Sequence, residues 1–360
     1  MKYARVKQMQ MKQYERVLVM SDLHGDVEGF RQVLKEFHVS SSDALVIVGD
    51  ILEKGCHSLQ LLQEIMNDSK QGNLYLVAGN NDTIFEEWRN NEISLEDVKW
   101  YMNSRENSIL IEMAHELHLN YETLEEIQRL KETIFKEYQD EIHFLSEIPE
   151  IIESETTIFV HAGIQPKNLD EQDPHYCLCA WEFAKTNESF EKMVVVGHWP
   201  ASNYCDDIIC VNPYYNPKNN TLSIDGGNSM KSWQQINVLI FDNNQMSMKA
   251  IDRCPKIKIL EDQEESKDSL SLIFPHTELI IKEKNEMESL CYLPYVNKER
   301  IFKNDQIYEY KGKTYCYDFT TYCLGVKKGE IVSYCEEMDD SILIKRNGIV
   351  GKYYGIYEKM

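Results

Sequence analysis

The sequence predicts an α/β fold, a layered sandwich of mixed β-sheets flanked by helices, with a smaller C-terminal all-β domain. Short runs rich in Val and Ile recur through the first 250 residues, and helical stretches separate the early runs. Their length and β-branching are typical of strands buried on both faces. In chain order the runs are RVLVM (16–20), ALVIV (44–48), NLYLVA (73–78), TTIFV (156–160), MVVV (193–196), TLSI (221–224) and INVLIF (236–241).

Composition excludes several classes of protein. The formal net charge of the 360 residues is -22, which disfavours binding to duplex nucleic acid. Mean hydropathy is -0.47, and no segment approaches the roughly 20 apolar residues of a spanning helix, so no membrane association is expected. The N-terminal stretch MKYARVKQMQMKQYER lacks a signal-peptide core, which predicts a cytoplasmic protein. The ten cysteines are scattered and are expected to be reduced thiols.

Polar residues with ligand chemistry follow the predicted strands in turn. One Asp or His after a strand is usually a turn former or a helix cap. Here successive strands each deliver such a residue, and open α/β sheets build their sites at the carboxyl ends of strands. The residues concerned are Asp22, His24, Asp50, Asn80, His161, His198 and Asp225. Asp225 could equally be a turn residue, so we expect no catalytic role for it.

These side chains suit two metal ions. The spacing in SDLHGD sends Asp22 and His24 toward the same side of an extended chain. Asp50, at the end of VIVGD, has two carboxylate oxygens and can bridge two cations. A mixed oxygen and nitrogen site without thiolate favours manganese, with iron or zinc as alternatives. One ligand set is then Asp22, His24 and Asp50, and the other is Asp50, Asn80, His161 and His198.

Five ordered motifs resemble those of the calcineurin-like metallophosphoesterases. SDLHGD, GDILEKG, GNND, HAGI and GHWP are similar to the family strings GDxHG, GDxxDRG, GNHE, HAG and GHT. KGCHSLQLL also parallels the DRGxxSLELL of the branch that holds phosphoprotein phosphatases and symmetrical dinucleoside tetraphosphatases. The resemblance spans roughly residues 15 to 250. It implies a layered metallophosphatase sandwich that holds two divalent ions, with a metal-bound hydroxide attacking phosphorus.

The chain departs from the family pattern where protons and phosphate are handled. Asn81 replaces the GNHE histidine that protonates the leaving oxygen, and an amide is no general acid. Asp82 is the first candidate for a substitute acid, and His57 is a weaker one. Lys54 replaces the DRG arginine; we expect it to steady the phosphate without a bidentate grip. Asn81 and Trp199 are expected to line the substrate pocket.

The resemblance predicts a dimetal phosphatase that acts on phosphate esters, with a serine/threonine-type protein phosphatase as one version. Phosphoprotein phosphatases place a second phosphate-binding arginine between the last two histidines, but this chain has no arginine between His161 and His198. The alternatives are a phosphodiesterase or dinucleoside polyphosphate hydrolase, or a metal-binding pseudoenzyme scaffold. The expected partner is therefore a phosphorylated substrate, either a phosphoprotein or a nucleotide.

Composition also predicts how the chain divides into domains. We expect a catalytic domain at 1–254, with a helical insertion at about 86–147 whose apolar residues recur at three and four spacing. The proline and acidic run of 255–269 predict a linker. Alternating aromatic and polar residues with KGK, KKG and NG turns predict a β-rich domain at 270–360, similar to bacterial SH3-like domains. This domain is expected to bind a peptide or to self-associate.

Overall fold

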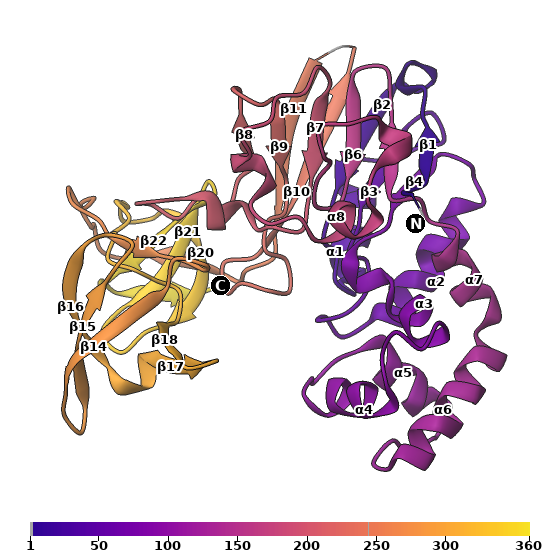
Figure 1. The fold of residues 1–360 in the computed structure, drawn as a ribbon. Coiled ribbons are helices and arrows are strands. Elements are labelled where there is room, and N and C mark those ends of the chain that lie inside the picture. The colour runs from indigo at the N-terminus through magenta and orange to yellow at the C-terminus, as the bar shows by residue number, and fades with distance from the viewer. Residues whose placement is uncertain (1–2, 244) are drawn as a thin grey trace. The chain divides into compact units, whose positions relative to one another are not determined.

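The computed structural model describes residues 3–243 and 245–360, and the chain divides into two compact units. Unit 1 comprises Met1–Ala201 and Asn212–Arg253. Unit 2 comprises Ser202–Val211 and Cys254–Met360. Figure 1 labels most of the helices and strands of both units.

A five-stranded sheet of unit 1 contains the strands that carry the first ligand motifs. Strands β2, β3 and β4 run parallel, and β10 pairs antiparallel with β2. Val17, Val19 and Val46 face one side of the sheet, while Leu18 and Met20 face the other. The strands are, in spatial order, β11 (Gln245–Asp252), β10 (Gln235–Asp242), β2 (Arg16–Met20), β3 (Ala44–Val48) and β4 (Leu74–Val77).

A second sheet of six strands carries the histidine motifs. Strands β6, β7 and β9 are parallel, so their carboxyl ends lie at the same edge. The spatial order is β1 (Val6–Gln8), β5 (Ile151–Glu153), β6 (Thr157–Val160), β7 (Met193–Val196), β9 (Thr221–Ser223) and β8 (Tyr214–Asn216). All seven apolar runs singled out in the sequence form strands, with ends that differ by at most one residue.

The two sheets form the inner layers of a four-layer sandwich, as predicted. One apolar cluster, including Val46, Phe159 and Leu222, lies between the sheets (Figure 1). A second cluster packs helices against the outer face of the five-stranded sheet, and a third packs the segment around α8 against the six-stranded sheet. The helices are α1 (Val27–Glu36), α2 (Ser58–Ser69), α3 (Ile84–Arg89), α4 (Leu95–Asn103), α5 (Ile109–Glu116), α6 (Leu124–Glu137), α7 (Gln139–Ser146) and α8 (Pro174–Cys179).

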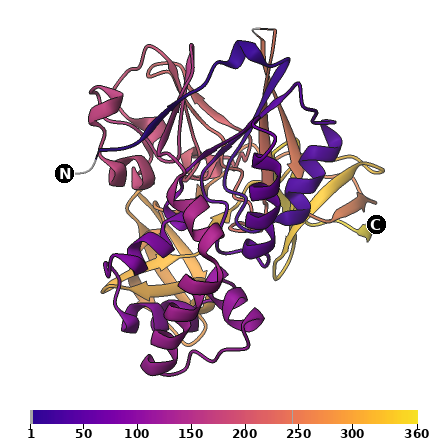
Figure 2. The ribbon, with the colours of Figure 1, turned by 90° about the vertical axis from the view of Figure 1, so that its right-hand side faces the viewer.

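Helices α3 to α7 form the helical segment 84–146, which follows β4 directly. Capping boxes define two of its helices: Ser94 with Asp97 begins α4, and Thr123 with Glu126 begins α6. In both ribbon views these purple helices gather beneath the strands of unit 1 (Figure 1, Figure 2). Short 3₁₀ turns occur at η1 (Met11–Gln13), η2 (Asn80–Asp82), η3 (Leu169–Glu171), η4 (Phe183–Lys185) and η5 (Ala201–Tyr204).

The Cys254–Met360 part of unit 2 is made of strands and the 3₁₀ turn η6 (Asn304–Gln306). Its first sheet is ordered β22 (Ile349–Tyr353), β21 (Ile342–Arg346), β20 (Ile331–Glu337), β12 (Lys256–Ile259), β23 (Tyr357–Lys359). Its second is ordered β16 (Lys298–Lys303), β15 (Glu288–Leu293), β14 (Glu278–Lys284), β18 (Lys313–Cys316), β17 (Ile307–Tyr310). A two-stranded sheet joins β13 (Ser271–Leu272) and β19 (Phe319–Thr320).

The segment expected to be a linker begins as a strand instead. Strand β12 pairs antiparallel with both β20 and β23, so it is central in its sheet. Ile257 and Ile259 are buried there while the intervening lysines are exposed, an alternation that the nearby proline and acidic run obscured. Ser202–Val211, also grouped with unit 2, lies within the range expected for the catalytic domain.

Within the part of the chain that the structure describes, none of the helices has both the length and the apolar character needed to cross a bilayer.

Shortening Phe159 should destabilise unit 1 strongly. The ring is fully buried between the sheets, so Phe159→Ala should lower the free energy of unfolding by about 3–5 kcal/mol. Urea titration followed by tryptophan fluorescence measures this, because all five tryptophans lie in unit 1. Tyr215→Ala, at a half-exposed position of β8, is the control and should cost less than about 1 kcal/mol. Equal losses for the two variants would contradict this description of the core.

Candidate metal centre

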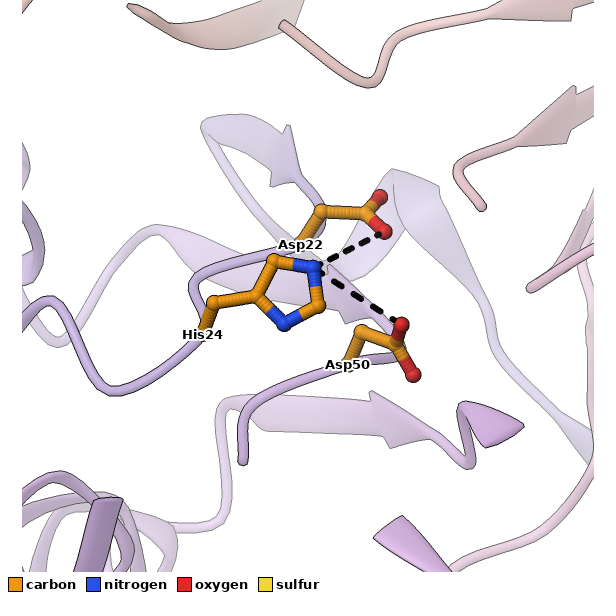
Figure 3. A group of neighbouring side chains, drawn as sticks. All are labelled: Asp22, His24 and Asp50. Carbon is orange, nitrogen blue, oxygen red and sulfur yellow. Dashed lines mark ion pairs between the residues drawn. The ribbon is translucent and has the colours of Figure 1, made fainter. Parts of the chain in front are cut away.

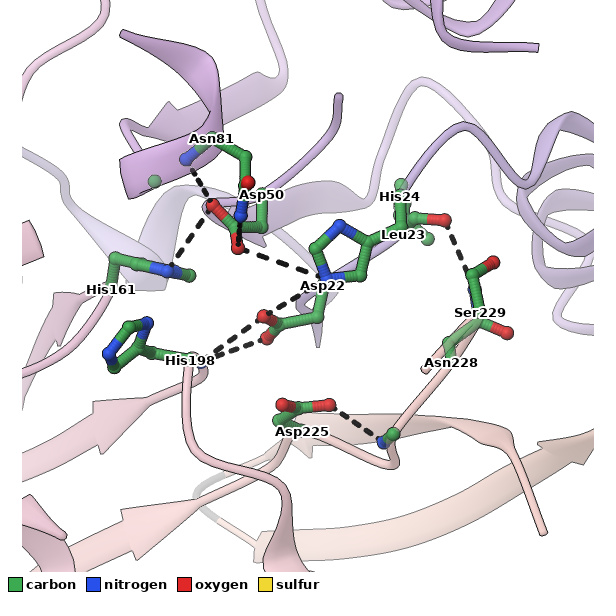
Figure 4. Close-up of polar contacts among 12 residues, drawn as sticks. Asp22, Leu23, His24, Asp50, Asn81, His161, His198, Asp225, Asn228 and Ser229 are labelled. Atoms are coloured by element: carbon green, nitrogen blue, oxygen red, sulfur yellow. Dashed lines mark hydrogen bonds and ion pairs between the residues drawn. The ribbon is translucent and has the colours of Figure 1, made fainter. Parts of the chain in front are cut away.

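The carboxyl ends of strands from both sheets deliver polar side chains to one place. Asp22 follows β2, Asp50 follows β3, and the turn η2 follows β4. From the other sheet, His161 follows β6 and His198 follows β7. Figure 4 shows the labelled side chains directed toward a common space. They are those of Asp22, Asp50, Asn81, His161 and His198. The predicted convergence of distant motifs is therefore present.

Asp22, His24 and Asp50 form a compact group that fits one cation. One ligand atom from each residue lies within 4.8 Å of the others (Figure 3). His24 Nε2 is 3.9 Å from Asp22 Oδ1 and 3.8 Å from Asp50 Oδ2. The other ring nitrogen, Nδ1, is 3.1 Å from the carbonyl oxygen of Leu52. A hydrogen bond of this kind orients a ligating histidine, so Nε2 faces the carboxylates.

Asp50 also contacts the second group of predicted ligands. His161 Nε2 lies 3.4 Å from Asp50 Oδ1 and 3.1 Å from Asn80 Oδ1. His198 Nδ1 is 2.9 Å from the same Asn80 oxygen. His161 is oriented through Nδ1, 3.0 Å from the carbonyl oxygen of Val48. All six predicted ligands are thus brought together, with Asp50 between the two groups.

The backbone at four of these residues is held in the left-handed region. For residues other than glycine this conformation costs on the order of 1–3 kcal/mol and persists only where the surroundings enforce it. Here the amides are bonded: Asp22 N donates to Gly49 O at 3.0 Å, and His24 N donates to Asp50 O at 2.9 Å. The strained loops therefore aim the ligands in advance. The φ angles are 52° at Asp22, 48° at His24, 53° at Asp50 and 63° at His198.

At two positions only glycine leaves enough room for the ligand side chains. A Cβ at Gly49, where φ is +79°, would meet His161 Nδ1 at 2.3 Å. A Cβ at Gly79 would meet Asp50 Oδ1 at 2.2 Å. The glycines of the GD and GN motifs are therefore steric requirements of the site as well as turn residues.

Negative charge is crowded in this buried cluster. Burial raises the pKa of Asp22 well above its usual value, and the nearby Asp225 raises it further. Burial likewise raises the pKa of Asp225 to about 6. Burial also opposes ionisation of Asp50, but His161, His24 and Lys54 outweigh it and hold the pKa of Asp50 well below the usual range.

The imidazoles respond in two ways to the same surroundings. Burial and the charge of Lys54 lower the pKa of His24 to about 4, and burial with His161 lowers the pKa of His198 to about 3. For His161, the Asp50 carboxylate overcomes burial and raises the pKa to about 10. His24 and His198 are therefore neutral donors for a borderline divalent cation, and His161 would release its proton when a cation binds, so the residues present fit a two-metal centre.

Comparison with known proteins gives a family match. The profile of the calcineurin-like phosphoesterases matches residues 15–208, more than half of the chain. The chain belongs to the calcineurin-like phosphoesterase family. It is accordingly a phosphoesterase hydrolase of a family that depends on two metal ions, and it contains a candidate metal site. Among curated proteins, none matched the sequence significantly.

Three solved structures are similar to this calcineurin-like phosphoesterase. One, of a protein assigned as a diadenosine tetraphosphatase, has 18% identity over 69% of this chain and 98% of its own, with a TM-score of 0.45. A Saccharomyces cerevisiae serine/threonine phosphatase with similarity to human phosphatase PP5 has 10% identity over 69% and 83%, with a TM-score of 0.41. A cold-active protein-tyrosine phosphatase of Shewanella has 14% identity over 70% and 83%, with a TM-score of 0.39.

Asp82 does not have the surroundings of the proton donor that the sequence suggested. Its Oδ2 accepts hydrogen bonds from the amides of Gly79 at 2.8 Å and Asp50 at 3.0 Å. Its Oδ1 accepts from Ile51 at 3.0 Å and Leu52 at 3.1 Å. Burial raises its pKa to about 7, but four amide donors favour the anion and occupy both oxygens. We therefore correct the expectation: Asp82 holds the loop after β3.

The other predicted substrate residues have different surroundings. The Asn81 side-chain amide donates to Asp50 Oδ2 at 2.5 Å, and its backbone N–H donates to Asp50 Oδ1 at 2.9 Å. Lys54 is half-buried, and its charge lowers the pKa of both His24 and His198. His57 is exposed as the N-cap residue of α2. Trp199 is 6% exposed, with its ring 6.5 Å from that of His198.

The DGGNS segment after β9 belongs to the site more closely than the sequence suggested. Asp225 is buried, and its carboxylate accepts from Gly227 N at 2.7 Å. Asn228 Nδ2 donates to the carbonyl oxygen of Leu23, between the ligands Asp22 and His24, at 3.1 Å (Figure 4). In the sequence, the only signal that this segment belongs to the site is the position of Asp225 after a strand. Asp225 could equally be a turn residue.

Divalent metal should stabilise this phosphoesterase more at pH 7.5 than at pH 5.5. The folded pKa of Asp225, about 6, exceeds its usual 3.8. Its contribution to the stability of the metal-free protein is full below about pH 4 and is lost as pH rises through about 6. Cations offset this loss, and protons compete with them for the histidines at low pH.

Thermal unfolding with and without Mn²⁺ measures this difference. At a hundredfold excess over the dissociation constant, binding adds about 2.7 kcal/mol at the higher pH. Asp43→Asn, remote from the ligands at the start of β3, should leave the metal-induced shift unchanged. A shift as large at pH 5.5 as at pH 7.5 would contradict the assigned ligand set.

Proposed function

We propose that the protein hydrolyses phosphoanhydrides, or phosphodiesters with a weakly basic leaving group, because these bonds break without a strong proton donor. The observation that carries this proposal is the pair Asn81 and Asp82. The first donates its amide to Asp50, and the second has both carboxylate oxygens bonded to backbone amides. A dinucleoside polyphosphate is a substrate of this class, in keeping with the sequence resemblance.

The ligand residues define where the reaction occurs. Asp22, His24 and Asp50 would hold one cation, and Asp50 with Asn80, His161 and His198 would hold the other. When bound, such a pair supplies a hydroxide nucleophile at neutral pH and neutralises the phosphoryl oxygens. Lys54 steadies the phosphoryl group as a point charge on a strained loop, where φ is 70°. Trp199 lines the pocket beside His198.

The leaving group decides between the possible substrates. Alkoxide from phosphoserine or phosphothreonine is strongly basic, and a general acid is worth about 10²–10⁴-fold for its departure. Phosphate from an anhydride is a far weaker base and needs little help. A serine/threonine-type phosphatase therefore requires a proton donor other than Asn81 or Asp82, whose polar groups are bonded to Asp50 and to backbone amides. A metal-holding scaffold is the remaining alternative, and it predicts two bound ions without turnover.

We also propose manganese as the native metal and the cytoplasm as the compartment. Carboxylate, amide and imidazole donors favour manganese, with iron or zinc as alternatives. The ten cysteines are scattered along the sequence, a distribution typical of reduced thiols in a reducing compartment. The sequence of residues 270–360 is similar to bacterial SH3-like domains. We propose that this part of unit 2 binds a peptide or a second copy of the chain.

Removing the bridging charge should abolish activity. Asp50→Asn should lower turnover of bis-p-nitrophenyl phosphate with Mn²⁺ by more than about a hundredfold, because even outer contacts of metal ligands are worth 10–100-fold. Wild-type hydrolysis of this diester and of a dinucleoside polyphosphate should exceed hydrolysis of phosphopeptides. Activity that survives Asp50→Asn, or a preference for phosphoserine peptides, would overturn the proposal.

Restoring an imidazole at position 81 tests the leaving-group argument separately. Asn81→His should raise turnover of alkyl phosphate monoesters at least about tenfold while leaving hydrolysis of anhydrides nearly unchanged. The comparison uses kcat for both substrate classes in one preparation, with metal content measured in parallel. Asn81→Ala is the control, since it also removes the amide but adds no acid. Equal effects of the two substitutions on monoesters would contradict a missing acid.

A further inference from the structure

The loop between Asp50 and α2 carries Lys54 and is anchored by carboxylates at both ends. Asp82 accepts the amides of residues 50 to 52 at the start of the loop. At its end, Glu112 of α5 accepts the amides of Ser58 at 2.8 Å and Leu59 at 2.9 Å. Ser58 Oγ in turn accepts from Glu53 N at 2.9 Å. Helix α5 therefore caps α2 from outside, beside the loop.

The side chain of Glu53, the residue before Lys54, extends from the loop to the start of α5. Its side chain is fully buried, and Oε1 accepts from Ser108 Oγ and from Ile109 N, both at 3.1 Å. Ser108 is the N-cap of α5, so Glu53 adds negative charge at that helix N-terminus. Glu53 of the loop thus caps α5, and Glu112 of α5 caps α2.

Helix α4 and the turn after it complete the surroundings of Glu53. Arg105 Nη1 lies 3.9 Å from Glu53 Oε2, and its guanidinium lies over the ring of Tyr101 at 4.0 Å. Burial and the carboxylate of Glu53 together raise the pKa of the Tyr101 phenol. A fully buried carboxylate of this kind is stable only while its donors remain in place.

The backbone explains why these contacts matter at Lys54. Glu53 and Lys54 are consecutive residues in the left-handed region, with φ of 69° and 70°. Two such residues in a row are strained and need outside contacts to hold them. The described contacts of this kind belong to Glu53, through its side chain in the helical segment and its amide on Ser58.

We propose that Glu53 is a positioning residue that connects helices α4 and α5 to Lys54, so that the helical segment 84–146 sets how tightly the site binds a phosphoryl group. The inference rests on the proposed function, in which Lys54 steadies the phosphate. The helical segment is then part of the phosphate site, although none of its residues is a predicted metal ligand. If the helical segment only packed against the sheet, removing the contact between Glu53 and α5 would leave phosphate affinity unchanged.

A double-mutant cycle on phosphate binding tests the connection. The full chain loaded with Mn²⁺ is titrated with inorganic phosphate by calorimetry, in wild type, Glu53→Gln, Lys54→Met and the double variant. Each single substitution should weaken phosphate binding about tenfold. Because Glu53 acts through Lys54, the double variant should also lose about tenfold, and not the hundredfold of independent sites.

A matched control separates positioning from general destabilisation. Asp43 is also a buried carboxylate, paired with Arg16 at 2.8 Å at the opposite end of β3. Asp43→Asn should lower the melting temperature and leave phosphate affinity unchanged. If Glu53→Gln fails to fold, Ser108→Ala removes one hydroxyl donor and keeps the charge. It should weaken phosphate binding less than tenfold, and the loss should vanish on the Lys54→Met background.

The outcomes distinguish this inference from the proposed function. Wild-type phosphate affinity in Glu53→Gln, or losses that multiply in the double variant, would overturn the inference. A loss in Glu53→Gln alone, with none in Lys54→Met, would overturn it as well, because Glu53 would then act by another route. Phosphate binding with no hydrolysis of any ester or anhydride would instead refute the proposed function, while the cycle would still decide the role of Glu53.

Discussion

The buried negative charge of Asp22, Asp50 and Asp225 is the constraint on which the rest of the site depends. Carboxylates so close together are unstable in a buried place unless cations neutralise them. The histidines do this only in part, because burial keeps His24 and His198 neutral. Parallel strands and left-handed loops nevertheless hold the group together against that repulsion. The fold therefore maintains an arrangement that protonation of Asp22 and Asp225 relieves at low pH and that divalent cations would stabilise at neutral pH.

A second group of carboxylates, near the predicted ligands, has a structural role. Asp82 and Glu112 accept backbone amides at the two ends of the loop after β3, and Glu53 of that loop accepts the Ile109 amide and the Ser108 hydroxyl at the start of α5. This division of labour explains the chemistry we propose. Asp82, which the sequence suggested as a substitute acid beside Asn81, is needed to hold the loop. In the proposed site the cations would bind the phosphoryl group, and neither Asn81 nor Asp82 would donate a proton. Anhydrides, and diesters with a weakly basic leaving group, suit such a site better than alkyl monoesters do.

The strands and metal ligands could be predicted from sequence because both rest on local signals. Runs such as ALVIV are buried on both faces, and each ligand follows such a run directly. The roles of Asp82 and Glu53 depend on contacts with residues about 30 and 55 positions away, which no local pattern reports. Asp225 was set aside because an aspartate before two glycines also forms turns. Strand β12 was missed because a proline and an acidic run flank only four alternating residues.

Electron paramagnetic resonance of Mn²⁺ titrated into the metal-free protein tests the central claim most directly. If Asp50 bridges two sites roughly 3.5–4 Å apart, two equivalents of Mn²⁺ should give the spectrum of an exchange-coupled pair. A spectrum of isolated ions at every stoichiometry, or saturation at one ion per chain, would contradict a shared bridging carboxylate and with it the account of the site.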